Sequence, residues 1–185
     1  MGMTLLFMLL SEKPEYSDKI NVAVHIAPVV FVTPPFRPFI KSYLALAPVA
    51  EKLSAAMQIY QVLPLSKVNQ IVGKDICTTE LGKTLCGTFL SPLGNIKNLN
   101  FTALPEILAY VPAGASINTL VHYHQIIKNG RFAKLYFGTS ANPSKYGSSR
   151  PSLYNLSKVT SRQAIFYSEI DVFVNVTDKL KLKTN

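Results

Sequence analysis

The sequence has no uncharged apolar run of the roughly 18 residues that a membrane-spanning helix needs, so it predicts no transmembrane segment. It also has no internal repeat, no low-complexity segment and no dense basic stripe. Basic residues outnumber acidic ones by 19 to 10, but the excess is scattered, apart from a short cluster at Lys179, Lys181 and Lys183. Because nucleic-acid surfaces are usually continuous basic stripes with interleaved aromatic residues, the sequence does not predict nucleic-acid binding.

Cysteine is scarce, with Cys77 and Cys86 standing nine residues apart in CTTELGKTLC. This spacing is poor for a metal site and no histidine lies near it, so no metal site is predicted. The two thiols either close a small disulfide loop or are unrelated buried thiols. No pattern indicates a cofactor, and none bears on the oligomeric state.

The composition is that of a globular protein, with 48% apolar and 16% charged residues, and 185 residues suffice for one domain with a sizeable core. Three Asn-x-Ser/Thr triplets are glycosylation candidates: Asn100 in NFT, Asn155 in NLS and Asn175 in NVT. Together with the cysteine pair they favour a secreted or lysosomal protein.

The opening stretch, MGMTLLFMLLSEKPEY, does not fit a targeting signal. No basic residue precedes its apolar run and no small-residue cleavage site follows, so no signal peptide is predicted, and Leu6 stands where a myristoylation signal needs Ser or Thr. As a helix, Thr4 to Leu10 is apolar on every side, which is typical of a helix buried in a large core. Gly2 would allow close approach of a strand, so this stretch indicates the interior of a domain.

The rest of the chain alternates core and helical patterns. A buried strand is predicted to end near Ile26, and QAIFYSEID predicts another buried strand that enters an acidic loop. Between them, residues 33–150 predict short helices separated by Pro and Gly. An insertion of this size in a parallel sheet is usually a cap over a site at the carboxyl ends of the strands.

Several stretches resemble the acid lipase family, the animal triacylglycerol lipases and cholesteryl ester hydrolases. LPEILAYVPAGASINTLVHYHQIIKNGRFAKLYFG, from Leu104 to Gly138, is similar to the family's Pro-Ala-Gly-Thr-Ser, Asn, His-Trp, Gln, Gly-x-Phe run. NPSKYGSSRPSLYNLSKVT resembles the family's Asn, Tyr, Pro-Pro-x-Tyr-x-Leu segment, and LSEKPEYSDKINVAVHIAPVVFV resembles the helix and strand after the family's nucleophile. The resemblance covers essentially residues 1–180.

The resemblance implies an α/β fold class, namely an α/β-hydrolase fragment with an inserted, mostly helical cap. Residues 1–32 would be core, 33–150 the cap, and 151–185 a return to the core that carries the acid-bearing strand and loop. The implied substrate is a lipid ester or lipid surface, with no cofactor. The pair Cys77 and Cys86 matches the family's cap disulfide.

The resemblance also assigns catalytic positions. Asp171 in FYSEID matches the catalytic carboxylate of a Ser-His-Asp triad, whereas Asp178 is expected to be a surface loop carboxylate. Met1-Gly2 matches the end of the G-x-S-x-G elbow, so Met1 would supply an oxyanion-hole N–H in a longer parent protein. The nucleophilic Ser is then expected immediately before Met1 and the catalytic His beyond Asn185, so the 185-residue chain is predicted not to hydrolyse esters.

Two histidines and a tyrosine in the region that resembles the family have no predicted catalytic role. His122 and His124 point about 200° apart on a helix and cannot share a metal, and His122 matches a structural His of the family. Tyr136 replaces an acidic residue common in relatives, which predicts a lost hydrogen bond or salt bridge.

Two alternatives to an enzyme stay open: a non-catalytic lipid-binding, storage or carrier relative, and a truncated product without independent function.

Overall fold

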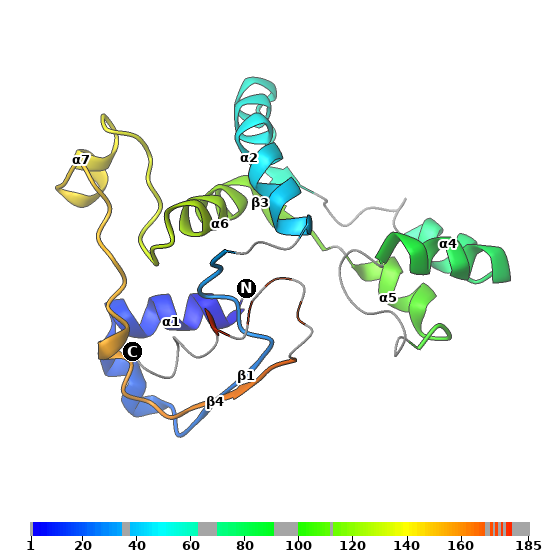
Figure 1. The fold of residues 1–185 in the computed structure, drawn as a ribbon, viewed down its shortest axis with the longest axis horizontal. Helices are drawn as coiled ribbons and strands as arrows, with labels where there is room; N and C mark the ends of the chain where they lie inside the picture. Colours follow the sequence, from blue (N-terminus) through cyan, green and yellow to red (C-terminus); the bar gives the residue numbers. More distant parts are fainter. Residues whose placement is uncertain are drawn as a thin grey trace. The chain divides into compact units, whose positions relative to one another are not determined.

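The computed structural model describes residues 2–34, 38–62, 70–90, 100–111, 113–168, 171, 173, 175, 177 and 178 (Figure 1). The chain forms two compact units, one from Met1–Leu44 with Val121–Asn185 and the other from Ala45–Leu120. The α-helices are α1 (Gly2–Glu12), α2 (Pro38–Met57), α4 (Glu80–Leu90), α5 (Leu104–Tyr110), α6 (Ile117–Asn129) and α7 (Asn142–Tyr146). The shorter helical turns are η1 (Pro14–Lys19), η2 (Val72–Ile76) and η5 (Leu156–Lys158). The strands are β1 (Ala23–Ile26), β2 (Gln61–Val62), β3 (Ala115–Ser116) and β4 (Gln163–Phe166).

The fold is mixed α/β, mostly helical with a small parallel sheet. Strands β1 and β4 pair in parallel, with Ala23 opposite Gln163 and Ile26 opposite Phe166, although residues 27–162 lie between them in sequence (Figure 1). The side chains also join the strands, because His25 Nε2 lies 2.5 Å from Gln163 Oε1. Two neighbouring parallel strands separated by a long helical stretch are the arrangement that the sequence predicted for the sheet.

Strand β1 ends at Ile26, but it is buried on one face only. Ala23 and His25 are buried, whereas Val24 and Ile26 are 60% and 82% exposed. The prediction of a fully buried strand is therefore wrong for this chain. An apolar run alone cannot distinguish one covered face from two, because side chains alternate between the faces of a strand.

Helix α1 also buries a single face. Thr4, Phe7, Leu10 and Ser11 are buried, and the Phe7 ring stacks on His25 of β1 with 5.4 Å between centroids. Leu5 and Leu9 on the other side are 56% and 41% exposed, so the expected burial on every side is not found. The expected close approach at Gly2 is also wrong, since a Cβ there would meet nothing within 4 Å.

Two buried clusters hold the unit formed by Met1–Leu44 and Val121–Asn185 together. Phe7, Val30, Ile126 and Phe132 form the first, and Val32, Ile40 and Ile127 form the second. Each fully buried apolar side chain contributes about 1.5–3 kcal/mol relative to exposure. Both clusters join the segment that follows β1 to α6, because Val30 packs with Ile126 in the first and Val32 with Ile127 in the second.

Helix α2 continues through Pro48, where the sequence predicted a break between short helices. Proline removes one hydrogen bond and crowds the preceding turn, but the bonds on either side remain available. The cost is therefore local, and the twenty residues from Pro38 to Met57 form one helix.

The unit formed by Ala45–Leu120 is organised around the disulfide between Cys77 and Cys86. Both cysteines are buried against Leu104 of α5, and Leu108 packs on them from the next turn. The antiparallel pair β2 and β3 joins Val62 to Ala115 in the same unit. The disulfide thus replaces part of the apolar core that a unit of this size would otherwise need.

Candidate functional site

The carboxyl ends of β1 and β4 meet at one edge of the sheet, because the strands are parallel. At this edge Ala27 N donates to Phe166 O over 2.8 Å, and Ala27 has a φ of 52°. A positive φ is uncommon for alanine, and such backbone conformations are found more often at functional sites than elsewhere. In open α/β sheets ligands bind at such carboxyl ends, so this edge is the candidate active site.

Asp171 comes after the carboxyl end of β4 in the chain. Its side chain is partly buried, and its Oδ1 accepts a hydrogen bond from Phe173 N over 2.8 Å. A bond to the backbone two residues on is the local turn that aspartate favours, and it orients the carboxylate. A carboxylate held in this way is chemically able to orient an imidazole and stabilise its charged form.

Asp178 is not the surface carboxylate that the sequence predicted, because its exposed fraction is 1%. Its Oδ2 accepts from Thr33 N over 2.9 Å and its Oδ1 accepts from the Thr33 hydroxyl. Asn175 Nδ2 donates to Thr33 O over 2.9 Å. We call Thr33, Asn175 and Asp178 the Thr33 cluster; it fastens the acid-bearing segment after β4 to the segment after β1.

The Thr33 cluster was missed at the level of sequence. The partners lie more than 140 positions apart, and no spacing rule connects them. The available signal was Asn175 within the apolar run VFVNV, since buried polar groups need hydrogen-bonding partners. Asp178 stands between Thr177 and Lys179 and carries no such signal.

A second polar contact fixes the beginning of α1. The Tyr123 hydroxyl donates to Thr4 Oγ1 over 2.8 Å, and Thr4 Oγ1 donates to Val29 O over 2.7 Å. Burial raises the pKa of Tyr123, while the bond to Thr4 opposes that shift. This chain of bonds holds α1, α6 and the segment after β1 at one point of the unit.

The two histidines of α6 have structural surroundings. His122 Nε2 donates to Ala133 O over 2.7 Å, and His124 is buried with its ring 6.3 Å from that of Tyr43. Burial raises the pKa of Tyr43 to about 12. Within the described residues, no group of three or more His, Cys, Asp or Glu side chains could hold a metal ion.

The remaining predicted residues are spread over the chain. Met1 lies outside the described residues. The glycosylation candidates Asn100 and Asn155 are exposed, with side-chain oxygens that accept from Thr102 N and Ser157 N, while Asn175 is partly buried in the Thr33 cluster. Tyr136 keeps two backbone bonds to the Gln125 side chain, at 2.8 and 3.0 Å.

No helix among the described residues is long and apolar enough to cross a membrane. No family model matches the chain.

Individual relatives match the chain over nearly its whole length. Lipase 3 of Drosophila melanogaster is 28% identical over 188 residues, which cover 98% of this chain and 47% of that protein. Gastric triacylglycerol lipase of Bos taurus is 27% identical over 181 residues, covering 96% and 45%. Lysosomal acid lipase/cholesteryl ester hydrolase of Rattus norvegicus is 28% identical over 180 residues, with the same coverage.

The chain is thus a distant homologue of acid lipases, which confirms the resemblance found in the sequence. It spans slightly less than half the length of these curated relatives.

Proposed function

We propose that the chain is part of a lipase-type carboxylic ester hydrolase with an α/β-hydrolase core, acting on triacylglycerols or steryl esters. Its core would comprise residues 1–32 and 151–185, and its helical cap residues 33–150. The observation that supports the proposal is the parallel pairing of β1 and β4, because Asp171 comes after the carboxyl end of β4 in the chain. The homology to lipases supports the same reaction class.

In the proposed mechanism Asp171 is the triad acid. It would accept the Nδ1 proton of a catalytic His, hold that ring in the reactive tautomer and stabilise the imidazolium formed when the nucleophilic Ser attacks the ester carbonyl. We place that Ser immediately before Met1 and that His beyond Asn185, and Met1 N–H would then face the oxyanion. The Thr33 cluster would hold the Asp171 segment at the sheet edge.

The exposed apolar residues on one face of α2 support contact with lipid. Leu46, Val49, Leu53 and Met57 of α2 recur at helical spacing, so they share one face, and they are 55–65% exposed. An exposed apolar stripe of this kind suits acyl chains or a lipid surface. We further propose a secreted or lysosomal location, which the disulfide and the exposed Asn100 and Asn155 support.

The same stripe favours a second candidate function, a lipid-binding relative without catalysis. The codons that precede Met1 in the gene separate the two functions. An in-frame Gly-x-Ser supports the hydrolase, and another residue in place of Ser supports the binding protein.

The direct test is Asp171→Asn in the protein that carries the proposed Ser and His. Loss of the triad acid is expected to lower kcat for a triacylglycerol by about 10³–10⁴-fold, because the His is no longer held in the reactive tautomer. Asp18→Asn is the matched control, since Asp18 is exposed in η1. Unchanged kcat in Asp171→Asn would remove Asp171 from the triad.

A further inference from the structure

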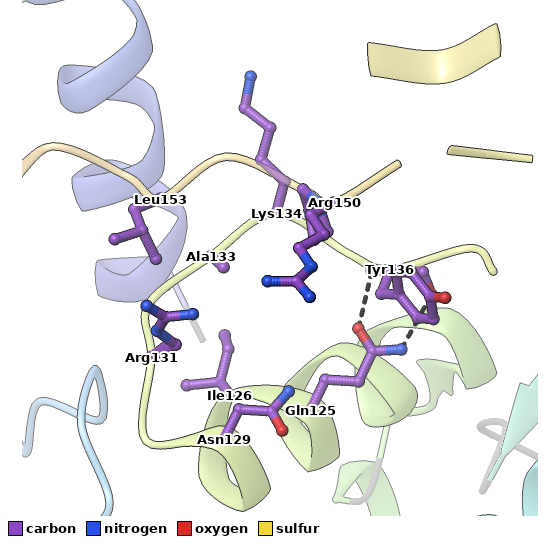
Figure 2. Close-up of a pocket in the computed structure, with 10 residues that line it drawn as sticks. Gln125, Ile126, Asn129, Arg131, Ala133, Lys134, Tyr136, Arg150 and Leu153 are labelled. Atoms are coloured by element: carbon purple, nitrogen blue, oxygen red, sulfur yellow. Dashed lines mark hydrogen bonds between the residues drawn. The ribbon is translucent and has the colours of Figure 1, made fainter. Parts of the chain in front are cut away.

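We propose that a cleft beside the end of α6 binds an amphiphilic anion, specifically the carboxylate of a medium- or long-chain fatty acid. The cleft has a volume of about 570 Å³ and lies between α6, the segment from Arg131 to Tyr136, and Arg150 to Leu153 (Figure 2). It contains none of the predicted catalytic residues.

Two guanidinium groups give the cleft its charge. Figure 2 shows the Arg131 and Arg150 side chains on either side of the hollow, with their guanidinium groups turned into it. Neither has an ion-pair partner in the part of the chain that the structure describes. Guanidinium groups bind carboxylate and phosphate oxygens through paired N–H donors, so the cleft is suited to an oxyanion.

Four other polar side chains line the cleft, namely Gln125, Asn129, Lys134 and Tyr136. Lys134 Nζ pairs with Glu12 at 2.5 Å and points away from the hollow. The Gln125 amide donates to Tyr136 O and accepts from Tyr136 N, as the dashed lines in Figure 2 show. Among the charged side chains that line the cleft, the two arginines are therefore those without an ion pair in the described part of the chain, and Asn129 lies in the same lining.

The floor of the cleft is apolar. Ile126 is 4% exposed, and Ala133, Pro151 and Leu153 line the same hollow. The volume is many times the roughly 30 Å³ that one water occupies in the liquid, so a bare anion would leave most of it unfilled. A ligand with an anionic head and an apolar body matches both the arginines and this floor.

The backbone around the cleft is cross-linked by hydrogen bonds. Lys134 N donates to Ser152 O over 3.0 Å, and Tyr154 N donates to Phe132 O over 2.9 Å. These bonds, with the isolated antiparallel bridge between Ala133 and Leu153, place Arg131 and Arg150 on adjacent antiparallel segments.

The choice of a fatty acid rests on the proposed function, because ester hydrolysis of lipids releases this class of carboxylate. The affinity of the cleft for an amphiphilic anion does not rest on it. The test below measures binding without turnover, so absence of ester hydrolysis leaves its result unchanged.

The experiment is calorimetric titration of the 185-residue chain with octanoate. Octanol has the same eight-carbon chain without a charge, and inorganic phosphate is an oxyanion without an alkyl chain. Octyl phosphate has the same chain with a phosphate head group in place of the carboxylate. We expect octanoate to bind at least about tenfold more tightly than octanol or phosphate, and at least as tightly as octyl phosphate.

The variants locate the binding. Arg131→Gln with Arg150→Gln is expected to weaken octanoate binding by about tenfold or more, and Arg150→Gln alone to weaken it measurably. Arg162→Gln, which removes the same charge from an exposed residue outside the cleft, is expected to leave it within about twofold.

Other outcomes overturn the proposal. They are an absence of saturable octanoate binding, equal affinity for octanol or for phosphate, and an equal loss in Arg162→Gln. A clear preference for octyl phosphate would overturn the assignment of the head group as a carboxylate.

Discussion

At the scale of single residues, the behaviour of a polar side chain depends on what surrounds it rather than on its type. Asp171 and Asp178 lie seven positions apart in the same segment. The Asp171 carboxylate accepts a hydrogen bond from the backbone N–H of Phe173, whereas Asp178 is almost completely buried and bonded to Thr33. The same carboxylate group is therefore a candidate for chemistry at one position and a structural anchor at the other.

The anchoring role of Asp178 predicts a loss of stability on its removal. Asp178→Ala leaves the N–H and hydroxyl of Thr33 without their acceptor, which is expected to cost about 2–3 kcal/mol of the free energy of unfolding. Urea denaturation measures this, with the exposed Asp18→Ala as control. Equal stability of the two variants would contradict the anchoring role.

The glycosylation candidates are expected to differ in occupancy. Asn100 and Asn155 are exposed, whereas the Asn175 amide donates to Thr33 O and is partly buried. Glycopeptide mass spectrometry after expression through a secretory pathway is expected to find glycan at Asn100 and Asn155 and little at Asn175, because a glycan there would disturb the Thr33 cluster. Full occupancy at Asn175 would show that the cluster tolerates a glycan.

Two partly buried tyrosines, Tyr43 and Tyr154, predict a loss of stability at alkaline pH. Burial raises the pKa of Tyr43 and of Tyr154 from 10.0 to about 12, and the charge of Glu12 adds to the shift at Tyr154. Above pH 10 the unfolded chain releases these protons before the folded chain does, so stability is present below pH 10 and falls as the pH rises towards 12. Tyr43→Phe and Tyr154→Phe are expected to flatten this decline in urea titrations, and an unchanged slope would refute it.

At the scale of elements, close approach of helices depends on glycine at a few positions. A Cβ on Gly73 in η2 would collide with the backbone of Ala109 in α5, and would lie 2.7 Å from Pro105 O. A backbone cannot rotate away as a side chain can. The contact between η2 and α5 therefore requires a residue without a side chain, next to the disulfide.

Gly73→Ala is accordingly expected to destabilise the unit formed by Ala45–Leu120 by about 1–3 kcal/mol, the usual cost of overpacking. Gly2→Ala in α1 is the control, because its added Cβ meets nothing within 4 Å and alanine favours the helix. Amide hydrogen exchange in α5 reports the loss locally. Unchanged protection of α5 in Gly73→Ala would mean that η2 and α5 do not pack so closely.

At the scale of the whole molecule, the proposed triad needs three side chains, and Asp171 is the one that we propose within these 185 residues. With the Ser and His of the triad outside these 185 residues, as proposed above, the chain would have no acyl-enzyme route, and we predict that it does not hydrolyse esters. An ester-hydrolysis assay with the purified chain and a full-length relative checks this. Turnover comparable to that of the relative would show that other residues of this chain carry the reaction.

The ancestry of the chain was readable from sequence, because motifs such as PAGAS and LYNL survive as local strings and distant homology confirms what they indicate. The end of β1 at Ile26 was also readable, since a β-branched run followed by Pro28 is a local signal. The disulfide needed the resemblance as well, because the spacing of Cys77 and Cys86 left unrelated thiols open.

Burial and partnership were decided by the tertiary structure alone. Three findings depend on contacts between different segments of the chain. They are the one-sided burial of α1 and β1, the hydrogen bonds between Asp178 and Thr33, and the cleft that Arg131 and Arg150 both line. Local composition fixes which elements form, because a turn or a strand depends on its neighbours along the chain. Which face of an element is buried, and which charged side chain is paired, depends on the residues from distant parts of the sequence that folding brings into contact with it.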